Sequence, residues 1–562
     1  MKIKKIVALS VGLMTIGSSI FATGCGGGGS TVVNDDTTIN VVLNQSGNGS
    51  GWLLEIADKF EALYKEQGYK VNLLDPRTGF TGKTALAEMR LGTATGVDLW
   101  LTSGVAVADA LDEDYGACVE NLTDVYNSKP INFDGTEGEM TLEELYNDEN
   151  EWAITDTNGD FYSYSPTTSI RGIVCNTKVL SQYGITQMPR TTNELFEAFD
   201  AVLYGANGKK GSAYTGIYPT TWGGDNAYGY ALYSFYTNLA QMMGVEPYDE
   251  FFKLDVLLEN DNALLAEGYS LYEGENAEAM KAALEVFIQQ YDTAYSTAGS
   301  ATQRHDDAHG KIIMGNAAFM TDGEFFFNEV RVNFNSKLHD VTFINTPVIS
   351  QLGVQLKLDG SGSDETKCDD ILSYMIGLID EGKNTADIKS ATETQFGVTL
   401  TDAQVERVLE ARKVGFQVTT AGGYVTKGSK KADIAKLFLR MLASEDASNV
   451  YAKYGMLSAY SKTDVNSYEY DFTKGAAQIN NFCDYFVHTE MYPGTLRAKI
   501  GPNLMSPYTA TMVTKIPEKI GAVTDPKTQR NYEELSANLY KEIQNHWKNN
   551  WKTELAKAGI EL

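Results

Sequence analysis

The stretch that decides the fold class is residues 39–75, INVVLNQSGNGSGWLLEIADKFEALYKEQGYKVNLLD. Its first six residues form an apolar run that predicts a buried strand, and YKVNLLD at its end predicts a second strand. The residues between them predict an amphipathic helix that stops at Gly68. Strands that alternate with helices pair in parallel, so the segment predicts an α/β fold. The apolar face of this helix is expected at Leu54, Ala57, Phe60, Leu63 and Tyr64.

The same alternation continues along the chain. A helix is predicted for TALAEMRLGTATG (84–96), a third strand for VDLWLTSG (97–104) and another helix for VAVADALDEDYG (105–116). In such sheets, ligands bind beyond the carboxyl ends of the strands. Those ends are Asn44–Gly47 and Thr102–Gly104, which are small and polar, although polar residues are also ordinary in loops.

The pattern changes after residue 150. WAITDTNGDFYSYSP (152–166) predicts two strands around an Asn158-Gly159 turn. The segment 355–415 is interpreted as an insertion, with a loop at LDGSGSDETK and a capped helix at TDAQVERVLEARKVG. The other predicted elements are a strand leading into a helix at 170–180, helices at 190–203 and 277–295, a strand, turn and short helix at 317–330, and a strand at 340–348.

The N-terminus predicts export and a lipid anchor. MKIKK is basic, and the apolar run after it contains too many Ser, Gly and Thr residues for a good membrane span, so residues 1–24 are predicted to be a signal peptide. The residues before Cys25 resemble a lipobox, with Ala22 in place of the usual Leu, which predicts acylation of Cys25. Residues 25–37 would then be a flexible tether. The alternative is an ordinary signal peptide cut near Cys25.

Composition excludes several classes of partner. The formal net charge is −28, which argues against binding to nucleic acid or to anionic lipid headgroups.

The cysteines after residue 25 are scattered and contain no CxxC pair, so we expect buried free thiols rather than a disulfide framework. These cysteines are Cys118, Cys175, Cys368 and Cys483.

Five stretches carry a resemblance to a known family, although none of them is a strict signature: VDLWLTSG, FYSYSPTTSIRGIVCNTKVLSQYGI, GKIIMGNAAFMTDGEFFFNEV, GGYVTKGSKKADIAKLFLRMLASEDA and GMLSAYS. Their order and spacing resemble those of the extracellular solute-binding proteins of ABC importers, in the maltose-binding-protein-like family that takes sugars and oligosaccharides. Apart from 355–415, the resemblance covers nearly the whole mature chain.

The resemblance implies a class II periplasmic-binding-protein-like fold, with two α/β lobes joined by a multi-strand hinge that lets them close around a ligand. Lobe one is expected to hold residues 38–166 and 421–465, and lobe two residues 167–420 and 466–562. It also implies the partners: an oligosaccharide ligand and the permease subunits of an ABC transporter. We expect a monomer with no cofactor and no catalytic activity.

The resemblance also implies site residues. Phe325 falls where the family often places a stacking Trp, and Glu324 where a polar residue often meets sugar hydroxyls. IYPTTWGGDNAYGY would add Tyr218, Trp222 and Asp225 from the second lobe. For each residue the alternative is a packing or surface role. The remaining expected contacts are Gln45, Ser46, Thr102 and Ser103 from the first lobe and Tyr424 from the second crossing between lobes.

Other chemistry is set aside. His305 and His309 in HDDAH have the i,i+4 spacing of a zinc helix, but the expected Glu is replaced by Asp306 and no third ligand is evident, so solvated imidazoles are expected. Two rivals stay open. One is an exported glycoside hydrolase, and the other is the same fold binding a peptide, a polyamine or a metal complex.

Overall fold

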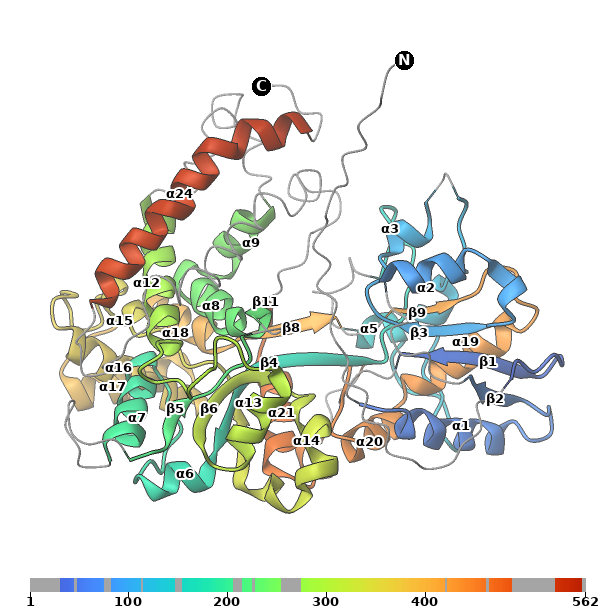
Figure 1. The fold of residues 1–562 in the computed structure, drawn as a ribbon, viewed down its shortest axis with the longest axis horizontal. Helices are drawn as coiled ribbons and strands as arrows, with labels where there is room; N and C mark the ends of the chain where they lie inside the picture. The colour runs from blue at the N-terminus through green and yellow to red at the C-terminus, as the bar shows by residue number, and fades with distance from the viewer. Residues whose placement is uncertain are drawn as a thin grey trace.

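The computed structural model, drawn in Figure 1, contains two β-sheets, each with its own covering helices. Figure 1 places the two sheets on opposite sides of the molecule, with the long strand β4 running between them. The residues described are 31–44, 48–74, 82–112, 115–146, 154–205, 215–224, 228–253, 274–419, 422–460, 464–487 and 531–557.

The smaller sheet has the strand order β2-β1-β3-β9. β1 pairs in parallel with β2 and β3, as predicted, and β9 closes the sheet antiparallel to β3. The helices that cover it meet through rings, for example Phe60 and Phe438 with centroids 5.1 Å apart. These elements are β1 (Thr38–Leu43), β2 (Lys70–Leu73), β3 (Leu99–Thr102), β9 (Gly422–Val425), α1 (Gly51–Leu63), α2 (Gly82–Met89), α3 (Val107–Ala110), α19 (Ala432–Leu442) and α20 (Glu445–Lys453).

The predicted apolar face of α1 is partly wrong. Leu54 is 47% exposed, whereas Trp52, Leu53 and Ile56 are buried together with Phe60. The reason is that α20 covers α1 on a side that includes Trp52, whose ring meets Tyr451 edge-on at 5.5 Å. An amphipathic pattern fixes the face of a helix only to within a residue or so when apolar residues are adjacent.

The larger sheet has the order β11-β8-β4-β6-β5, and β7 and β10 also pair with β4. β4 is antiparallel to β6, β7, β8 and β10, while β5 runs parallel to β6 and β11 parallel to β8. The strands are β4 (Thr167–Asn176), β5 (Tyr218–Thr220), β6 (Ala317–Gly323), β7 (Val341–Ile344), β8 (Val414–Thr419), β10 (Leu457–Ser458) and β11 (Tyr485–Val487).

Helices surround this sheet, and α24 packs along α12 (Figure 1). Those used below are α8 (Tyr228–Met243), α13 (His305–Ile313) and α14 (Phe326–Phe334). The others are α6 (Thr177–Gln182), α7 (Thr192–Tyr204), α9 (Val245–Lys253), α12 (Gly274–Gln290), α15 (Gln351–Gln355), α16 (Glu365–Asp380), α17 (Thr385–Phe396), α18 (Asp402–Arg412), α21 (Asp471–Phe482) and α24 (Tyr532–Lys557), with short helices α4 (Thr123–Tyr126) and α5 (Leu142–Leu145) near the smaller sheet.

Three connections between the two sheets lie side by side. The first connection enters the larger sheet in β4 at Thr167. The second leads from Thr419 of β8 to β9 of the smaller sheet, and the third returns to the larger sheet through β10. Thr167 pairs with Ser458 and Thr168 with Thr419, so the three connections are hydrogen-bonded to one another. The molecule is therefore a mixed α/β protein of two lobes, and its hinge consists of several paired strands.

The segment 355–415 is built into the larger lobe. Its helices α16 and α18 pack on each other, and α18 packs on α8. Cys368, Ile371 and Leu372 of α16 are fully buried. The predicted capped helix is confirmed as α18, where Thr401 and Gln404 form a reciprocal capping box.

Two local predictions are corrected. The Asn158-Gly159 turn forms, but its flanks make one isolated bridge, from Thr155 to Phe161, instead of two strands. The reason is that the Asp156 side chain accepts hydrogen bonds from the N–H groups of Asn158 and Asp160 and so competes with backbone pairing.

The expected tether is shorter than predicted, because residues 31–37 contact the smaller sheet. There the Val33 N–H donates to Asn40 Oδ1 at 3.0 Å, and Asn40 Nδ2 donates to the Val33 carbonyl at 2.9 Å.

The expectation for the cysteine thiols is confirmed: Cys118, Cys175, Cys368 and Cys483 are buried and form no disulfide. Burial raises the pKa of the Cys118 and Cys368 thiols. None of the helices in the described part of the chain combines the length and apolar character needed to cross a bilayer.

Candidate functional site

The carboxyl ends of β1 and β3 meet, as parallel pairing requires. Asn44 follows β1, and its Nδ2 donates to Ser103 Oγ at 2.9 Å. The Gly82 N–H donates to the Ser103 carbonyl at 2.8 Å, which adds the start of α2 to this edge. Thr102 is fully buried, so Ser103 is the more accessible of the two predicted polar residues. Gln45 and Ser46 lie outside the described residues.

A buried ion pair lies in the larger lobe, where β4 and β6 run side by side. Ser169 Oγ donates to Glu324 at 2.7 and 2.8 Å, and Arg171 Nη1 lies 3.3 Å from Glu324 Oε2. Arg171 is 6% and Glu324 3% exposed. Burial raises the pKa of Glu324 above its ordinary value, although the guanidinium and the Ser169 hydroxyl oppose that shift.

Three half-buried aromatic rings surround this ion pair. The Arg171 guanidinium carbon lies 4.8 Å from the Phe325 ring centre and 5.2 Å from that of Tyr233. Tyr230 lies 5.5 Å from Tyr233 and 5.6 Å from Phe325. Tyr230 and Tyr233 share one face of α8 because they are three residues apart. We call these five residues, Arg171, Tyr230, Tyr233, Glu324 and Phe325, the aromatic wall.

The aromatic wall lies next to contacts between the lobes. Phe325 is the N-cap of α14, and in the first turn of that helix Asn328 Nδ2 donates to Asn48 Oδ1 at 2.7 Å. Asn48 belongs to the loop that follows β1 in the smaller lobe. In the last turn, the Arg331 guanidinium carbon lies 5.9 Å from the Tyr454 ring centre, beyond the end of α20. α14 therefore contacts the other lobe at both of its ends.

Other predicted site residues lie elsewhere. Trp222 is 7% exposed, meets Tyr291 edge-on at 5.5 Å and belongs to the larger hydrophobic core, which favours the packing alternative. Tyr424 is fully buried, and its hydroxyl donates to the Val105 carbonyl at 2.7 Å. Tyr218 pairs with Ala317 at the start of β6, whereas Phe325 follows the end of that strand, about 20 Å away at ~3.3 Å per residue. Asp225 lies outside the described residues.

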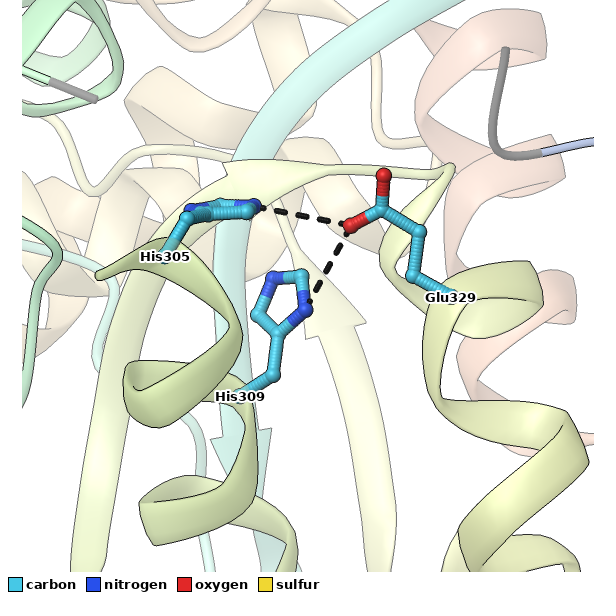
Figure 2. A group of neighbouring side chains, drawn as sticks. All are labelled: His305, His309 and Glu329. Carbon is cyan, nitrogen blue, oxygen red and sulfur yellow. Dashed lines mark ion pairs between the residues drawn. The ribbon is translucent and has the colours of Figure 1, made fainter. Parts of the chain in front are cut away.

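The expectation of solvated imidazoles at His305 and His309 is wrong. Figure 2 shows both rings turned toward Glu329 of α14. His309 is 4% exposed at its side chain, and its Nε2 lies 2.6 Å from Asp322 Oδ2 at the end of β6. Burial disfavours the charged form of each group, which by itself would raise the pKa of Asp322 and lower that of His305. The two imidazoles outweigh burial at Asp322 and hold its pKa below the ordinary value. Asp322 and Glu329 outweigh burial at His305 and raise its pKa. The cluster adjoins the aromatic wall, since His305 lies 4.6 Å from Tyr230.

Comparison with known proteins identifies the fold. No protein-family model matches the sequence, and neither does any curated protein. Solved structures do match. The bacterial solute receptor AcbH, described as having an exclusive preference for β-D-galactopyranose, superposes with a TM-score of 0.52 at 13% identity, covering 92% of this chain and 100% of that one. The chain has the two-lobed fold of the bacterial solute receptors.

Two further solute-receptor structures agree with this assignment. A probable secreted solute-binding lipoprotein from Streptomyces coelicolor gives a TM-score of 0.52 at 12% identity, covering 92% of this chain and 100% of its own. A manno-oligosaccharide-specific solute-binding protein from Bifidobacterium animalis subsp. lactis, solved in complex with mannotriose, gives a TM-score of 0.51 at 12% identity. The match covers 93% of this chain and 95% of that one. At such identities the solute-receptor likeness assigns the fold alone.

Sequence reasoning missed three residues of the aromatic wall. Arg171 was visible as the one charged residue in the short run IRGIVC, which is a signal of a buried ion pair. Tyr230 ends the quoted stretch IYPTTWGGDNAYGY, and Tyr233 follows one helical turn later. Nothing in the local sequence places α8 against β4 and β6, so the three residues meet only in the folded chain.

Proposed function

We propose that the protein is an extracytoplasmic receptor that captures a carbohydrate of oligosaccharide size and delivers it to an ABC transporter permease. The observation that carries this proposal is the aromatic wall. Sugars present C–H patches that stack on rings and hydroxyls that need charged or polar partners. Phe325, Tyr230 and Tyr233 offer the rings, and the buried ion pair of Arg171 with Glu324 lies against Phe325 and Tyr233 and fixes their positions.

The charge of the aromatic wall supports a neutral ligand. A polyamine site needs several converging carboxylates, whereas Glu324 is already paired with Arg171 at 3.3 Å. For the same reason, Glu324 is poorly placed to serve as one half of a glycosidase carboxylate pair. We therefore propose a binding protein without catalytic activity, acting as a monomer whose lobes hold residues 38–166 with 421–465 and residues 167–420 with 466–562.

The test is a ligand screen on protein produced without residues 1–25. A thermal-shift panel should include mono- and oligosaccharides, peptides and polyamines. Ligand at 100 times its Kd adds about 2.7 kcal/mol of stability, a clear rise in melting temperature. Stabilisation by sugars alone supports the proposal. Stabilisation only by peptides or polyamines overturns the ligand class, and release of cleaved sugar products overturns the assignment as a binding protein.

We further propose that Cys25 carries the lipid that anchors the receptor outside the cell membrane. Residues 31–37 contact the smaller sheet, so the proposed tether is confined to residues 25–30. Cys25→Ala should move the protein from the membrane fraction to the soluble exported pool. Unchanged membrane association contradicts the anchor.

A further inference from the structure

We propose that His305, His309 and Glu329 form a zinc-binding site in the larger lobe, in which the carboxylate of Asp322 orients His309. The two histidines lie one turn apart on α13, and Glu329 lies on α14, so a bound ion would join the two helices (Figure 2). Two imidazoles and one carboxylate are a ligand set that suits Zn²⁺. The site is separate from the aromatic wall in its residues and does not depend on the proposed sugar ligand.

The distances fit a tetrahedral ion. His305 Nε2 lies 3.6 Å and His309 Nδ1 3.4 Å from Glu329 Oε2. One ligand atom from each of the three residues falls within a span of 4.8 Å. A tetrahedral zinc with bonds of about 2.1 Å separates its ligand atoms by roughly 3.4 Å, so small side-chain movements complete the site.

Asp322 provides the orientation that metal-binding histidines need. His309 Nε2 lies 2.6 Å from Asp322 Oδ2, while its other nitrogen, Nδ1, faces Glu329. The carboxylate therefore favours a proton on Nε2, which leaves the Nδ1 lone pair for a metal. Asp322 is itself fixed, because its Oδ1 accepts the Gly323 N–H at 2.7 Å.

The polar atoms of His305 point to the same conclusion. Its Nδ1 and Nε2 are both buried, and neither has a hydrogen-bond partner in the described part of the chain. Nε2 lies 3.6 Å from Glu329 and 3.7 Å from Asp322, beyond hydrogen-bond length. The carboxylates of Asp322 and Glu329 both face these rings, and a divalent cation would neutralise their negative charges. The competing arrangement is a metal-free network in which the imidazoles are protonated.

The experiment is a zinc titration of tag-free protein that has been treated with chelator and dialysed. Calorimetry should report about one equivalent of Zn²⁺, and cobalt(II) should give the intense visible bands of a tetrahedral site. His305→Ala and Glu329→Gln, whose side chains are 15% and 31% exposed, should each weaken binding at least tenfold while the protein stays folded. Asp322→Asn should weaken it about 10- to 100-fold, as loss of the carboxylate that orients a metal-binding histidine does.

His339→Ala is the matched control, since His339 stacks on Tyr470 at 4.9 Å outside the cluster. This variant should bind zinc as the wild type does. The proposal is overturned if the wild type binds no zinc at micromolar concentration, or if His305→Ala and Glu329→Gln bind as tightly as His339→Ala. Either result would leave the protonated ion-pair network as the role of the cluster. Circular dichroism of each variant confirms that lost binding is not lost folding.

Discussion

Alanine substitutions at Phe325 and Trp222 should have opposite effects on binding and stability. Phe325 is half-buried at the aromatic wall, whereas Trp222 is 7% exposed and packs in the core. Phe325 is only partly exposed, and we take roughly 50 Å² as the area that a stacked sugar would remove from water. At ~25 cal/mol per Å² this contributes about 1.3 kcal/mol, or close to tenfold in Kd.

Trp222→Ala removes a large ring from a packed site. Its indole Nε1 donates to Ser296 Oγ at 3.1 Å, so the change also removes a buried hydrogen bond. Loss of a buried aromatic ring costs about 3–5 kcal/mol of unfolding free energy. Phe325→Ala should cost less, since this ring is less buried than Trp222, and should lower affinity for the best sugar from the screen about tenfold.

Isothermal titration together with urea melts of the ligand-free proteins separates the two effects. Tyr115→Ala, at an exposed ring in the smaller lobe, is the control for a surface aromatic. Normal affinity in Phe325→Ala would remove this ring from the binding site, and with it the argument for the aromatic wall. Unchanged stability in Trp222→Ala would refute its assignment to the core.

Three stability predictions follow from other contacts. Asp98→Ala should lower the unfolding free energy by about 3–5 kcal/mol, because it leaves the buried Lys431 ammonium, 2.8 Å away, without its carboxylate partner. A loss of less than about 1 kcal/mol in urea melts would contradict this prediction. Gly475→Ala should cost at least ~2 kcal/mol, since a Cβ there collides with a main-chain oxygen of β7. Gly310→Ala has open space within α13, so in the same melts it should not destabilise and should add up to about 1 kcal/mol. Burial raises the pKa of Glu324, so its ionisation costs stability: relative to Glu324→Gln, the wild type should be most stable below about pH 4 and should lose stability as the pH rises through the raised pKa. Urea melts of both proteins from roughly pH 4 to 8 that show a constant difference would refute this linkage.

The order of strands and helices could be predicted because it rests on local patterns. The alternation over residues 39–104 gave the parallel pairing of β1, β2 and β3, and the Thr401–Gln404 cap marked the start of α18. The prediction failed where a side chain competes with the backbone, as at Asp156, or where a neighbouring helix decides which face is buried, as at Leu54. Such competition depends on tertiary contacts that a sequence window does not contain.

The candidate site was less predictable than the fold. Phe325 and Glu324 were predicted from the family resemblance alone, which places a stacking ring and a polar residue after this strand. Trp222 drew attention as a large ring in a glycine-rich loop, yet those glycines let the chain pack closely against its neighbours: a Cβ at Gly223 would collide with the backbone of His305. Glycine next to an aromatic residue therefore marks a close backbone approach as readily as an open binding loop.

One helix connects the candidate sugar site, the contact between the lobes and the proposed zinc site. Phe325 caps α14, Asn328 in its first turn bonds Asn48 of the smaller lobe, and Glu329 faces the two histidines of α13. A nine-residue helix moves as one body, so an ion that fixes Glu329 also fixes the ring and the contact between the lobes. If zinc and sugar both bind, their affinities should be linked, and by reciprocity each should change the other by the same factor. Titrating sugar with zinc present and again with chelator measures that factor; an equal Kd in both conditions would show that α14 does not couple the sites, while the separate zinc and sugar titrations would still decide each site on its own.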